Sequence, residues 1–312
     1  MRPADRKLDD AARAAWLAYI GGRKQDEIAT IMGISRQSAQ RLVSQAMAAG
    51  LVKVRIDHPI GRCQELAGEI MARYGLETCE VVPSIDRGRD AGMGVAHATA
   101  DILERWLTLP EPQVIGLGTG RTLRAAIEEL PHIDCAWHKI VSLTGNITPS
   151  GSTAYYNVLF TISDKVTAPT YPLPLPVIAA TEAERDLLMG QATLATSRDL
   201  AGRIDKRFVG IGQIRQNAPL VLDGFISEAD QARLAAKGAV GEITGWVYDA
   251  EGRLIEDEIN ARVSSVPLVA GGSAPAIACA HGPDKIDAIR GALNGRYVNG
   301  LVTDERTAEA LL

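Results

Sequence analysis

The pattern of hydrophobic positions divides the chain into a short helical head and a longer body. Three segments of the head carry apolar residues at helical spacing, and glycines separate them. Ser35 stands where the third helix would begin and is a favourable N-cap residue. The segments predicted to be helices are residues 9–20, 24–32 and 35–49.

The second and third of these segments have the spacing of a helix-turn-helix. Gly33 supplies the turn, and Ile34 is placed to fill the core behind it. The outer face of the third helix presents hydrogen-bonding side chains that could enter a major groove. The residues LVKVRID after Gly50 are typical of a strand or wing whose basic side chains contact phosphates. We therefore expect DNA contacts from Ser35, Arg36, Gln37, Ser38, Gln40, Arg41, Lys53 and Arg55.

The charge distribution supports DNA binding by the head. Its first 55 residues carry ten Lys and Arg against five Asp and Glu, a net charge of +5. The whole chain carries −5, so the remaining residues carry −10. A basic head on an acidic body indicates that only the head meets a polyanion. The alternative is a small amphipathic three-helix domain with ordinary solvated charges on its outer face.

The body, from about Pro59 onward, alternates between short apolar runs and amphipathic helical stretches. This alternation predicts an α/β fold with a doubly wound, mostly parallel sheet. Aromatic residues make up only 4% of the chain, so the core must be built from Ala, Val, Leu and Ile, which suits a buried parallel sheet. We expect two domains, residues 1–57 and 58–312, with the helix of residues 62–76 connecting them and pairing subunits.

Three local features of the body lead to specific expectations. The proline-rich passage of residues 168–180 is expected to end in a strand. Residues 181–202 are expected to form one helix. Two strands between residues 238 and 255 are expected to form a hairpin-like pair with Ala250–Gly252 at the turn.

The segment VIGLGTGRTL, residues 114–123, has the strand–loop–helix order of an anion-binding turn. Glycines let the backbone approach a ligand, while threonine hydroxyls and N–H groups at the helix start can donate to a phosphate. The segment lacks the Gly-Lys-Ser/Thr of a Walker loop and the full GxGxxG fingerprint. An ordinary glycine-rich turn with capping threonines remains the alternative. The candidate ligand residues are Gly116, Gly118, Thr119, Gly120, Arg121 and Thr122.

Other predicted strands also end in polar or glycine-rich sequences, namely LTGN, GIGQ and CAHGPDK. In an open α/β sheet ligands bind at the carboxyl ends of the strands, so these ends are expected to converge on one pocket. Asn146 and Lys285 are candidates there; Lys285 is placed at a helix start, where an anion would relieve its unfavourable position.

The sequence gives no indication of a metal site, a cofactor or a membrane segment. The four cysteines are far apart without a CxxC pair, and the histidines have no metal-ligand spacing. No apolar run approaches the length of a membrane span, and the N-terminus has no apolar signal core. We expect a cytoplasmic protein with reduced, mostly buried thiols.

Taken in this order, the segments resemble the SorC family of sugar-responsive transcriptional regulators over essentially the full length. The segments that carry the resemblance are DEIATIMGISRQSAQRLVSQAMAAGLVKVRI, VIGLGTGRTL, YPLPLPVIA, VGIGQI, KGAVGEITGWVYDAEGRLI and PDKIDAIRGALNGRYVNGLVTDERTAEALL. The resemblance implies a winged helix-turn-helix followed by an effector domain similar to ribose-5-phosphate isomerase and glucosamine-6-phosphate deaminase. It also implies phosphorylated sugar effectors and homodimers or homotetramers on the operator.

Carried over residue by residue, the resemblance places a phosphate on the loop from Gly118 to Thr122, with Lys285 reaching it. It places Asp249 near the sugar end, although Asp249 before Gly252 is also typical of a turn aspartate. The chain departs from the family pattern in CAHGPDK, where His281 stands in place of the first glycine of a pair, and in Arg121 within the loop.

Three functions follow from these observations. The first is a DNA-binding regulator of a carbohydrate or polyol catabolic operon, whose affinity for operator double-stranded DNA is set by a small sugar or polyol, expected to be phosphorylated. The second is a sugar-phosphate isomerase or deaminase that carries a DNA-binding head. The third is an interaction protein whose pocket is a relic. The strand ends show no compact acid–base constellation, so we expect no enzyme.

Overall fold

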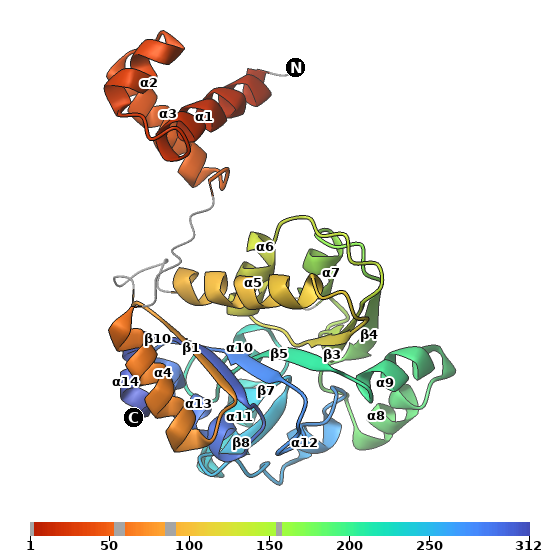
Figure 1. Ribbon diagram of the computed structural model, residues 1–312. Coiled ribbons are helices and arrows are strands. Elements are labelled where there is room, and N and C mark those ends of the chain that lie inside the picture. Colours follow the sequence, from red (N-terminus) through yellow and green to blue (C-terminus); the bar gives the residue numbers. More distant parts are fainter. Residues whose placement is uncertain (1–2, 53–59, 85–91, 154–157) are drawn as a thin grey trace. The chain divides into compact units, whose positions relative to one another are not determined.

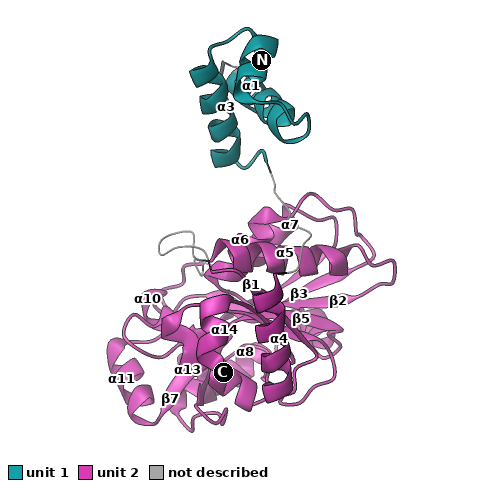
Figure 2. Ribbon diagram, turned by 60° about the vertical axis from the view of Figure 1, so that its left-hand side comes forward, with its two compact units in different colours: residues 1–58 teal, residues 59–312 magenta. Residues whose placement is uncertain are grey.

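The computed structural model describes residues 3–52, 60–84, 92–153 and 158–312. It divides into two compact units, Met1–His58 and Pro59–Leu312 (Figure 2). The expected wing, with Lys53 and Arg55, lies outside the described residues. None of the described helices has the length and apolar character needed to cross a lipid bilayer.

The first unit is a bundle of three helices, α1 (Pro3–Tyr19), α2 (Gln25–Met32) and α3 (Arg36–Ala48). Its core is small and built largely from alanines, with Ile28 as the largest fully buried side chain. Gly33 ends α2 with a φ of +66°, a left-handed conformation that glycine adopts without strain. The Ser35 hydroxyl caps α3 by accepting a hydrogen bond from the Ser38 N–H at 3.2 Å. The three expected helices and the turn are confirmed.

The second unit contains a seven-stranded sheet in which every neighbouring pair of strands is parallel. The strand order is β1-β10-β9-β5-β2-β3-β4. The bounds are β1 Thr78–Val82, β2 Val114–Leu117, β3 Lys139–Ile147, β4 Thr170–Pro176, β5 Lys206–Gly210, β9 Ala276–Cys279 and β10 Gly300–Asp304. The parallel α/β fold expected from the alternation is therefore confirmed.

Helices cover both faces of this sheet, and a separate hydrophobic core fills each side (Figure 1). One core includes side chains from four helices, and the other includes side chains from three. The first group is α4 Gly61–Tyr74, α9 Ala195–Ala201, α13 Ile286–Asn294 and α14 Glu305–Leu311, and the second is α5 Met93–Leu107, α6 Arg121–Glu129 and α7 Val158–Ser163. The many alanines and branched aliphatics let these helices approach the sheet closely.

A smaller antiparallel sheet branches from the large one directly after β5. Its order is β6-β7-β8, and it packs on a third core with short helices around it. The bounds are β6 Gly212–Gln213, β7 Ala239–Ile243, β8 Trp246–Asp249, α10 Pro219–Leu222, α11 Glu228–Ala236 and α12 Glu258–Arg262. The β7–β8 turn is Thr244-Gly245, both with positive φ, which suits a two-residue hairpin. The β7–β8 pair therefore does not turn at Ala250–Gly252 as expected; those residues form a second turn after β8, closed by the Asp249 N–H donating to the Arg253 carbonyl oxygen at 3.0 Å.

Two further expectations need correction. Residues 181–202 form α8 (Glu182–Met189), a short 3₁₀ turn at Ala192–Leu194 and α9, because the chain leaves the helix at Gly190. In the proline-rich passage the strand is β4 itself, within the prolines and not after them. Strand β4 lies at the edge of the sheet. Its prolines lack N–H groups, which is tolerated there because the outer side of an edge strand has no neighbouring strand to accept a hydrogen bond. The sequence also gave no expectation for α7 or α10.

One buried carboxylate fastens α11 to the start of α12. The side chain of Asp257 is 2% exposed and accepts hydrogen bonds from Nε and Nη2 of Arg233, both at 3.1 Å. Lys237 Nζ lies 2.8 Å from the same carboxylate, which also caps α12 by accepting from the Ile259 N–H at 3.0 Å. The hydrogen bonds from Arg233 hold the pKa of Asp257 well below its usual range.

We expect Asp257→Ala to lower the free energy of unfolding at pH 7 by at least about 1 kcal/mol, the value of the helix cap alone. A carboxyl whose pKa is lowered by folding stabilises the protein above its unfolded pKa, and this stabilisation is lost as the pH falls. The variant should therefore lose less stability than the parent between roughly pH 5 and pH 3 in urea unfolding. Glu251→Gln, which removes a carboxylate that is 62% exposed, is the control. Equal behaviour of the two variants would contradict this role for Asp257.

Candidate functional site

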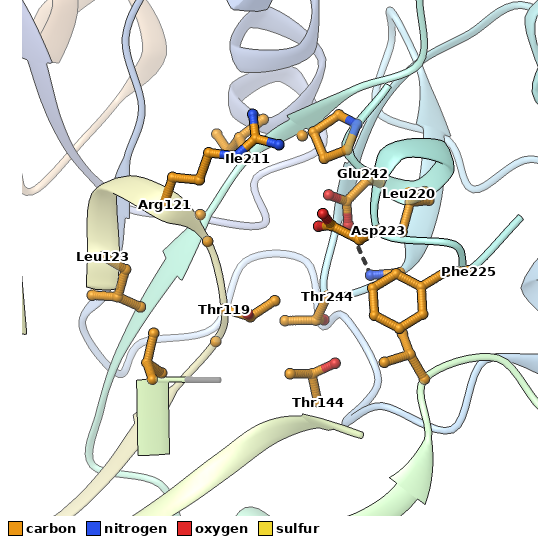
Figure 3. Close-up of a pocket in the computed structure, with 18 of the residues that line it drawn as sticks. Thr119, Arg121, Leu123, Thr144, Ile211, Leu220, Asp223, Phe225, Glu242 and Thr244 are labelled. Carbon is orange, nitrogen blue, oxygen red and sulfur yellow. Dashed lines mark hydrogen bonds between the residues drawn. The ribbon is translucent and has the colours of Figure 1, made fainter. Parts of the chain in front are cut away.

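A cavity of about 110 Å³ lies at the carboxyl ends of β2, β3, β5 and β9, against the turn of the small sheet (Figure 3). This is several times the space that one buried water needs, roughly 10–15 Å³. The walls come from four strand ends, the start of α6, α10 and β7, all within the second unit. The position is the one where open parallel sheets bind ligands.

The loop between β2 and α6 forms one wall of the cavity. The Gly118 N–H donates to the Phe208 carbonyl oxygen at 2.8 Å, which ties the loop to β5. Gly120 has a φ of +135°, which strongly favours glycine, and α6 begins at the next residue. The first turn of a helix leaves N–H groups without intrahelical partners and carries partial positive charge. Gly118, Thr119, Gly120, Arg121 and Thr122 all line the cavity, so an anion could bind here.

Two glycines, one at the end of β5 and one at the start of β6, leave the space in which this wall forms. A Cβ added at Gly210 would lie 2.6 Å from the Thr119 carbonyl oxygen, so the loop backbone and the end of β5 are in direct contact. A Cβ added at Gly212 would overlap the carboxylate of Glu242. Side chains at these positions would displace the loop or the carboxylate.

Two carboxylates and two cationic side chains line the same cavity. Glu242 on β7 accepts a hydrogen bond from the Gly245 N–H at 2.8 Å, and burial raises the pKa of this carboxyl against the opposing charge of Lys285. Burial also raises the pKa of Asp223, with Arg121 opposing. Burial lowers the pKa of the Lys285 amine. The common cause of these three shifts is the loss of hydration around the charged form of each group.

Neutral polar groups complete the polar lining. Thr144 accepts a hydrogen bond from the Ser265 hydroxyl at 3.0 Å, and Ser142 donates to the Thr144 carbonyl oxygen at 2.8 Å. The Asn146 Oδ1 atom is buried and has no hydrogen-bond partner among the described residues. A ligand hydroxyl that donates to Asn146 would relieve the cost of burying that oxygen.

Apolar side chains form the rest of the lining, including Phe225 and Leu220 opposite the glycine loop (Figure 3). They limit the access of water, which strengthens electrostatic interactions inside the cavity. An arrangement of a few convergent polar groups on apolar walls is typical of a small-molecule site.

The structure separates the expected ligand residues into two groups. Gly118 to Thr122, Asn146 and Lys285 line the cavity. Gly116 does not; a Cβ there would lie 2.8 Å from Leu143 Cδ2, so this glycine allows close packing on the sheet. Asp249 does not line it either, because its carboxylate accepts from the N–H groups of Glu251 and Arg253 and pairs with the Arg253 side chain. Asp249 is a turn residue.

Two carboxylates that do not stand at the predicted strand ends, Glu242 and Asp223, line the same cavity as Lys285. Glu242 stands in the segment KGAVGEITGW and Asp223 follows α10, so neither is at an end of the large sheet. The polar side chains that the sequence reasoning missed are Glu242, Asp223, Ser142, Thr144 and Thr244. Their signal was weak: Glu242 is a single charge within an apolar strand. His281 is outside the lining and packs toward Gly92, with burial lowering its pKa.

The exposed face of α3 carries the expected DNA-contacting side chains. Arg36, Gln37, Gln40 and Arg41 are exposed. Arg36 Nε lies 3.4 Å from an Asp26 oxygen, with both side chains more than two-thirds exposed, so this pair contributes little stability. Ser35 and Ser38 hydrogen-bond to each other at the helix start, which gives them a capping role.

The described residues contain no group of three or more His, Cys, Asp or Glu side chains placed to hold a metal ion. Cys279 lines the cavity, but burial raises the pKa of its thiol to about 12. The thiol is therefore protonated and unreactive at neutral pH.

Residues 58–312 match the family model described as "Putative sugar-binding domain". The chain belongs to the SorC family of sugar-binding transcriptional regulators. It is 35% identical to the "Erythritol catabolism regulatory protein EryD" of Brucella abortus (strain 2308), over the full chain and 98% of the relative. It is 32% identical to the "Transcriptional regulator LsrR" of Enterobacter sp. (strain 638), over 96% of this chain and 92% of that one.

A solved structure shows the same architecture. The full-length sorbitol operon regulator SorC from Klebsiella pneumoniae matches with a TM-score of 0.71 and 25% identity, covering 97% of this chain and 98% of that chain. The order of a helical DNA-binding region followed by a sugar-binding α/β domain is therefore that of the family.

The close contact between the β2–α6 loop and β5 can be tested by adding a methyl group at Gly210. We expect Gly210→Ala to lower the free energy of unfolding by about 1–3 kcal/mol, because its methyl group must displace the loop backbone. Gly68→Ala is the matched control: Gly68 is exposed within α4 with open space around it, and alanine there should stabilise by roughly 1 kcal/mol. Urea unfolding of both variants measures the difference. A neutral Gly210→Ala would show that the loop is not held against β5.

Proposed function

We propose that this SorC-family regulator binds operator DNA through the first unit and controls a carbohydrate or polyol catabolic operon in response to a small ligand in the cavity. Residues 1–57 would form the DNA-binding domain and residues 58–312 the effector-binding and oligomerisation domain. The observation that carries the proposal is the cavity itself, where the N-terminus of α6, a part-buried amine, part-buried carboxylates and an amide oxygen without a partner among the described residues converge. We further propose that the protein acts in the cytoplasm, where such operators lie.

The polarity of the cavity indicates how a ligand would lie. The glycine loop from Gly118 to Thr122 and the first turn of α6 suit a phosphate, with the Lys285 amine adding positive charge. Glu242 and Asn146 suit hydroxyl groups, because each offers an acceptor oxygen on the cavity wall. A polyhydroxylated chain with one anionic end satisfies both regions.

The names of the relatives support this chemical class. One relative is named for erythritol catabolism and the structural neighbour for the sorbitol operon, so both names concern polyols. We propose that the effector is a sugar or polyol of about four to six carbons, in its phosphorylated form. The protein would act as a homodimer or homotetramer, with the effector preferring one arrangement of the subunits and so changing the spacing of the DNA-binding units. Operator half-sites would then be spaced by about 34–36 Å or a multiple of it.

Substitutions on α3 test the DNA-binding surface. We expect Arg36→Ala and Gln37→Ala each to weaken operator binding by about 1–3 kcal/mol, since each removes a base or phosphate contact. Folding and effector affinity should not change. Arg13→Ala on α1, which removes the same charge from another exposed position, is the control in electrophoretic mobility shifts. Unchanged operator affinity in both α3 variants would show that a different surface of the protein recognises the operator.

A thermal-shift screen tests the effector site. Free and phosphorylated pentoses, hexoses and four- to six-carbon polyols are the compounds to screen. A ligand at one hundred times its dissociation constant should add about 2.7 kcal/mol to the free energy of unfolding. The double variant Thr119→Val, Lys285→Ala should lose this shift and the operator response yet retain basal operator affinity. A full response in that variant would show that the glycine loop does not bind the effector. If the pocket is a relic that binds no ligand, none of the compounds will produce a shift.

The presence of Glu242, Asp223 and Lys285 in one cavity specifically favours a second candidate, an isomerase or deaminase activity. Buried carboxyls with raised pKa values are suited to general acid–base chemistry. We propose that the chain is a sensor without turnover, and sugar-phosphate turnover assays on the preparation that binds operator distinguish the two. Turnover that Glu242→Gln abolishes would establish the enzyme.

A further inference from the structure

Arg207 is a cationic side chain on β5, the central strand of the seven-stranded sheet. Its neighbours in register are Gly116 of β2 and Ala276 of β9. Side chains alternate between the two faces of a strand, and Phe208 belongs to the core packed by α5, α6 and α7. The Arg207 side chain therefore extends over the opposite face, which α4, α9, α13 and α14 cover. This is an uncommon place for a side chain that stays charged at neutral pH.

The Arg207 guanidinium has no partner in the described part of the chain. Its Nε atom is buried without a hydrogen bond, and no carboxylate oxygen of the described residues lies within 4.0 Å of the side chain. Burial lowers the pKa of Arg207. A buried charged donor is costly unless an acceptor satisfies it, so the acceptor must come from outside these residues.

A small cavity of about 20 Å³ is lined by this guanidinium. The volume suits one particle of roughly the size of a water molecule, which needs about 10–15 Å³. The walls are mostly aliphatic, and the described lining contains no carboxylate. Its two hydroxyl groups already donate, from Thr244 to the Ile243 carbonyl oxygen at 2.8 Å and from Tyr297 to the Gly252 carbonyl oxygen at 2.6 Å. The surroundings therefore place no negative charge beside the cation.

Backbone N–H groups beside the cavity are also unused. Leu268 and Val269 line it, and within residues 3–52, 60–84, 92–153 and 158–312 their N–H groups donate to no acceptor. The N–H groups on either side of this pair are satisfied, because Val266 and Gly271 each donate to a backbone carbonyl oxygen at 2.9 Å. Neighbouring backbone N–H groups next to a cation are typical of an anion site. A water molecule in the same space would leave the charge of Arg207 uncompensated.

We propose that Arg207 and the N–H groups of Leu268 and Val269 bind one small monovalent anion, such as chloride. A monatomic ion fits the space, whereas phosphate, with four oxygens, is too large. Apolar walls also favour a single charge, because the cost of removing an ion from water rises with its charge. The bound ion would neutralise the cation that folding places on the sheet and would fasten residues 266–269 to β5.

This anion site is distinct from the effector cavity. Gly118 to Thr122 and Lys285 line the larger cavity and not the smaller one. Thr244, in the β7–β8 turn, lines both, so the anion site lies behind this turn. The inference does not rest on the proposed function, because none of the proposed anion donors belongs to the effector site.

Chloride titration of the full-length protein tests the site. Urea unfolding is measured as sodium chloride replaces sodium gluconate at constant ionic strength. At ten times its dissociation constant, chloride should raise the folding equilibrium constant about elevenfold. Arg207→Met should remove this chloride dependence, whatever the substitution does to stability itself. Arg203→Met, which removes an exposed arginine shortly before β5, is the matched control and should retain it.

Bromide gives a measurement that needs no variant. Crystals of the parent protein grown in sodium bromide should show an anomalous scattering peak in contact with the Arg207 guanidinium. Water in that position at saturating bromide would overturn the proposal. Equal chloride dependence in the parent and in Arg207→Met, or none in the parent, would also overturn it. Stabilisation by acetate but not by chloride would replace the proposal with a carboxylate site.

Discussion

The backbone of the β2–α6 loop lies against the end of β5, and this contact positions the wall of the cavity that the glycine loop forms. Gly210 allows it, because the Thr119 carbonyl oxygen occupies the space of a side chain there. The contact directs the N-terminus of α6 toward the cavity. Two residues after Gly210 the chain leaves the large sheet at Gly212, where β6 pairs with β7, the strand that carries Glu242 on the opposite wall. A helix start from one sheet and a carboxylate from the other thus face the same space.

Burial gives these opposed groups their chemical character. A carboxylate and an amine in water would both be charged at neutral pH and strongly hydrated. Behind apolar walls, burial raises the pKa of Glu242 and lowers that of Lys285, so each is shifted toward its neutral form. The Gly245 N–H and the opposite charge limit these shifts. Each group therefore presents less charge to a ligand than it would in water.

Several elements that lead to the site could be predicted from local sequence patterns, although the break at Gly190 and the helices α7 and α10 could not. The helix-turn-helix, the α6 loop and the helix start at Lys285 each have a recognisable pattern within one continuous segment, and the structure places the latter two at one cavity. Glu242 could not be found this way, because its role depends on β5 leaving the sheet at Gly212. Gly116 and Gly118 look alike in sequence, yet one packs against Leu143 and the other lines the cavity. Gly116 lies within β2 and Gly118 just beyond its end, and spacing alone does not show where the strand ends and the cavity begins.

Specificity in such a cavity follows from the cost of groups that are already buried. The Asn146 oxygen has no partner among the described residues, and the Glu242 carboxyl accepts one backbone hydrogen bond, so folding has already removed most of their hydration. A ligand hydroxyl that donates to one of these oxygens gains the full benefit of a hydrogen bond, whereas a ligand that lacks this hydroxyl leaves the oxygen unpaired, at about 1–3 kcal/mol. Discrimination against a ligand lacking one hydroxyl is then about fivefold to 150-fold without any change in shape. A regulator that must tell one small polyhydroxylated molecule from another therefore benefits from polar groups that the folded protein leaves unsatisfied.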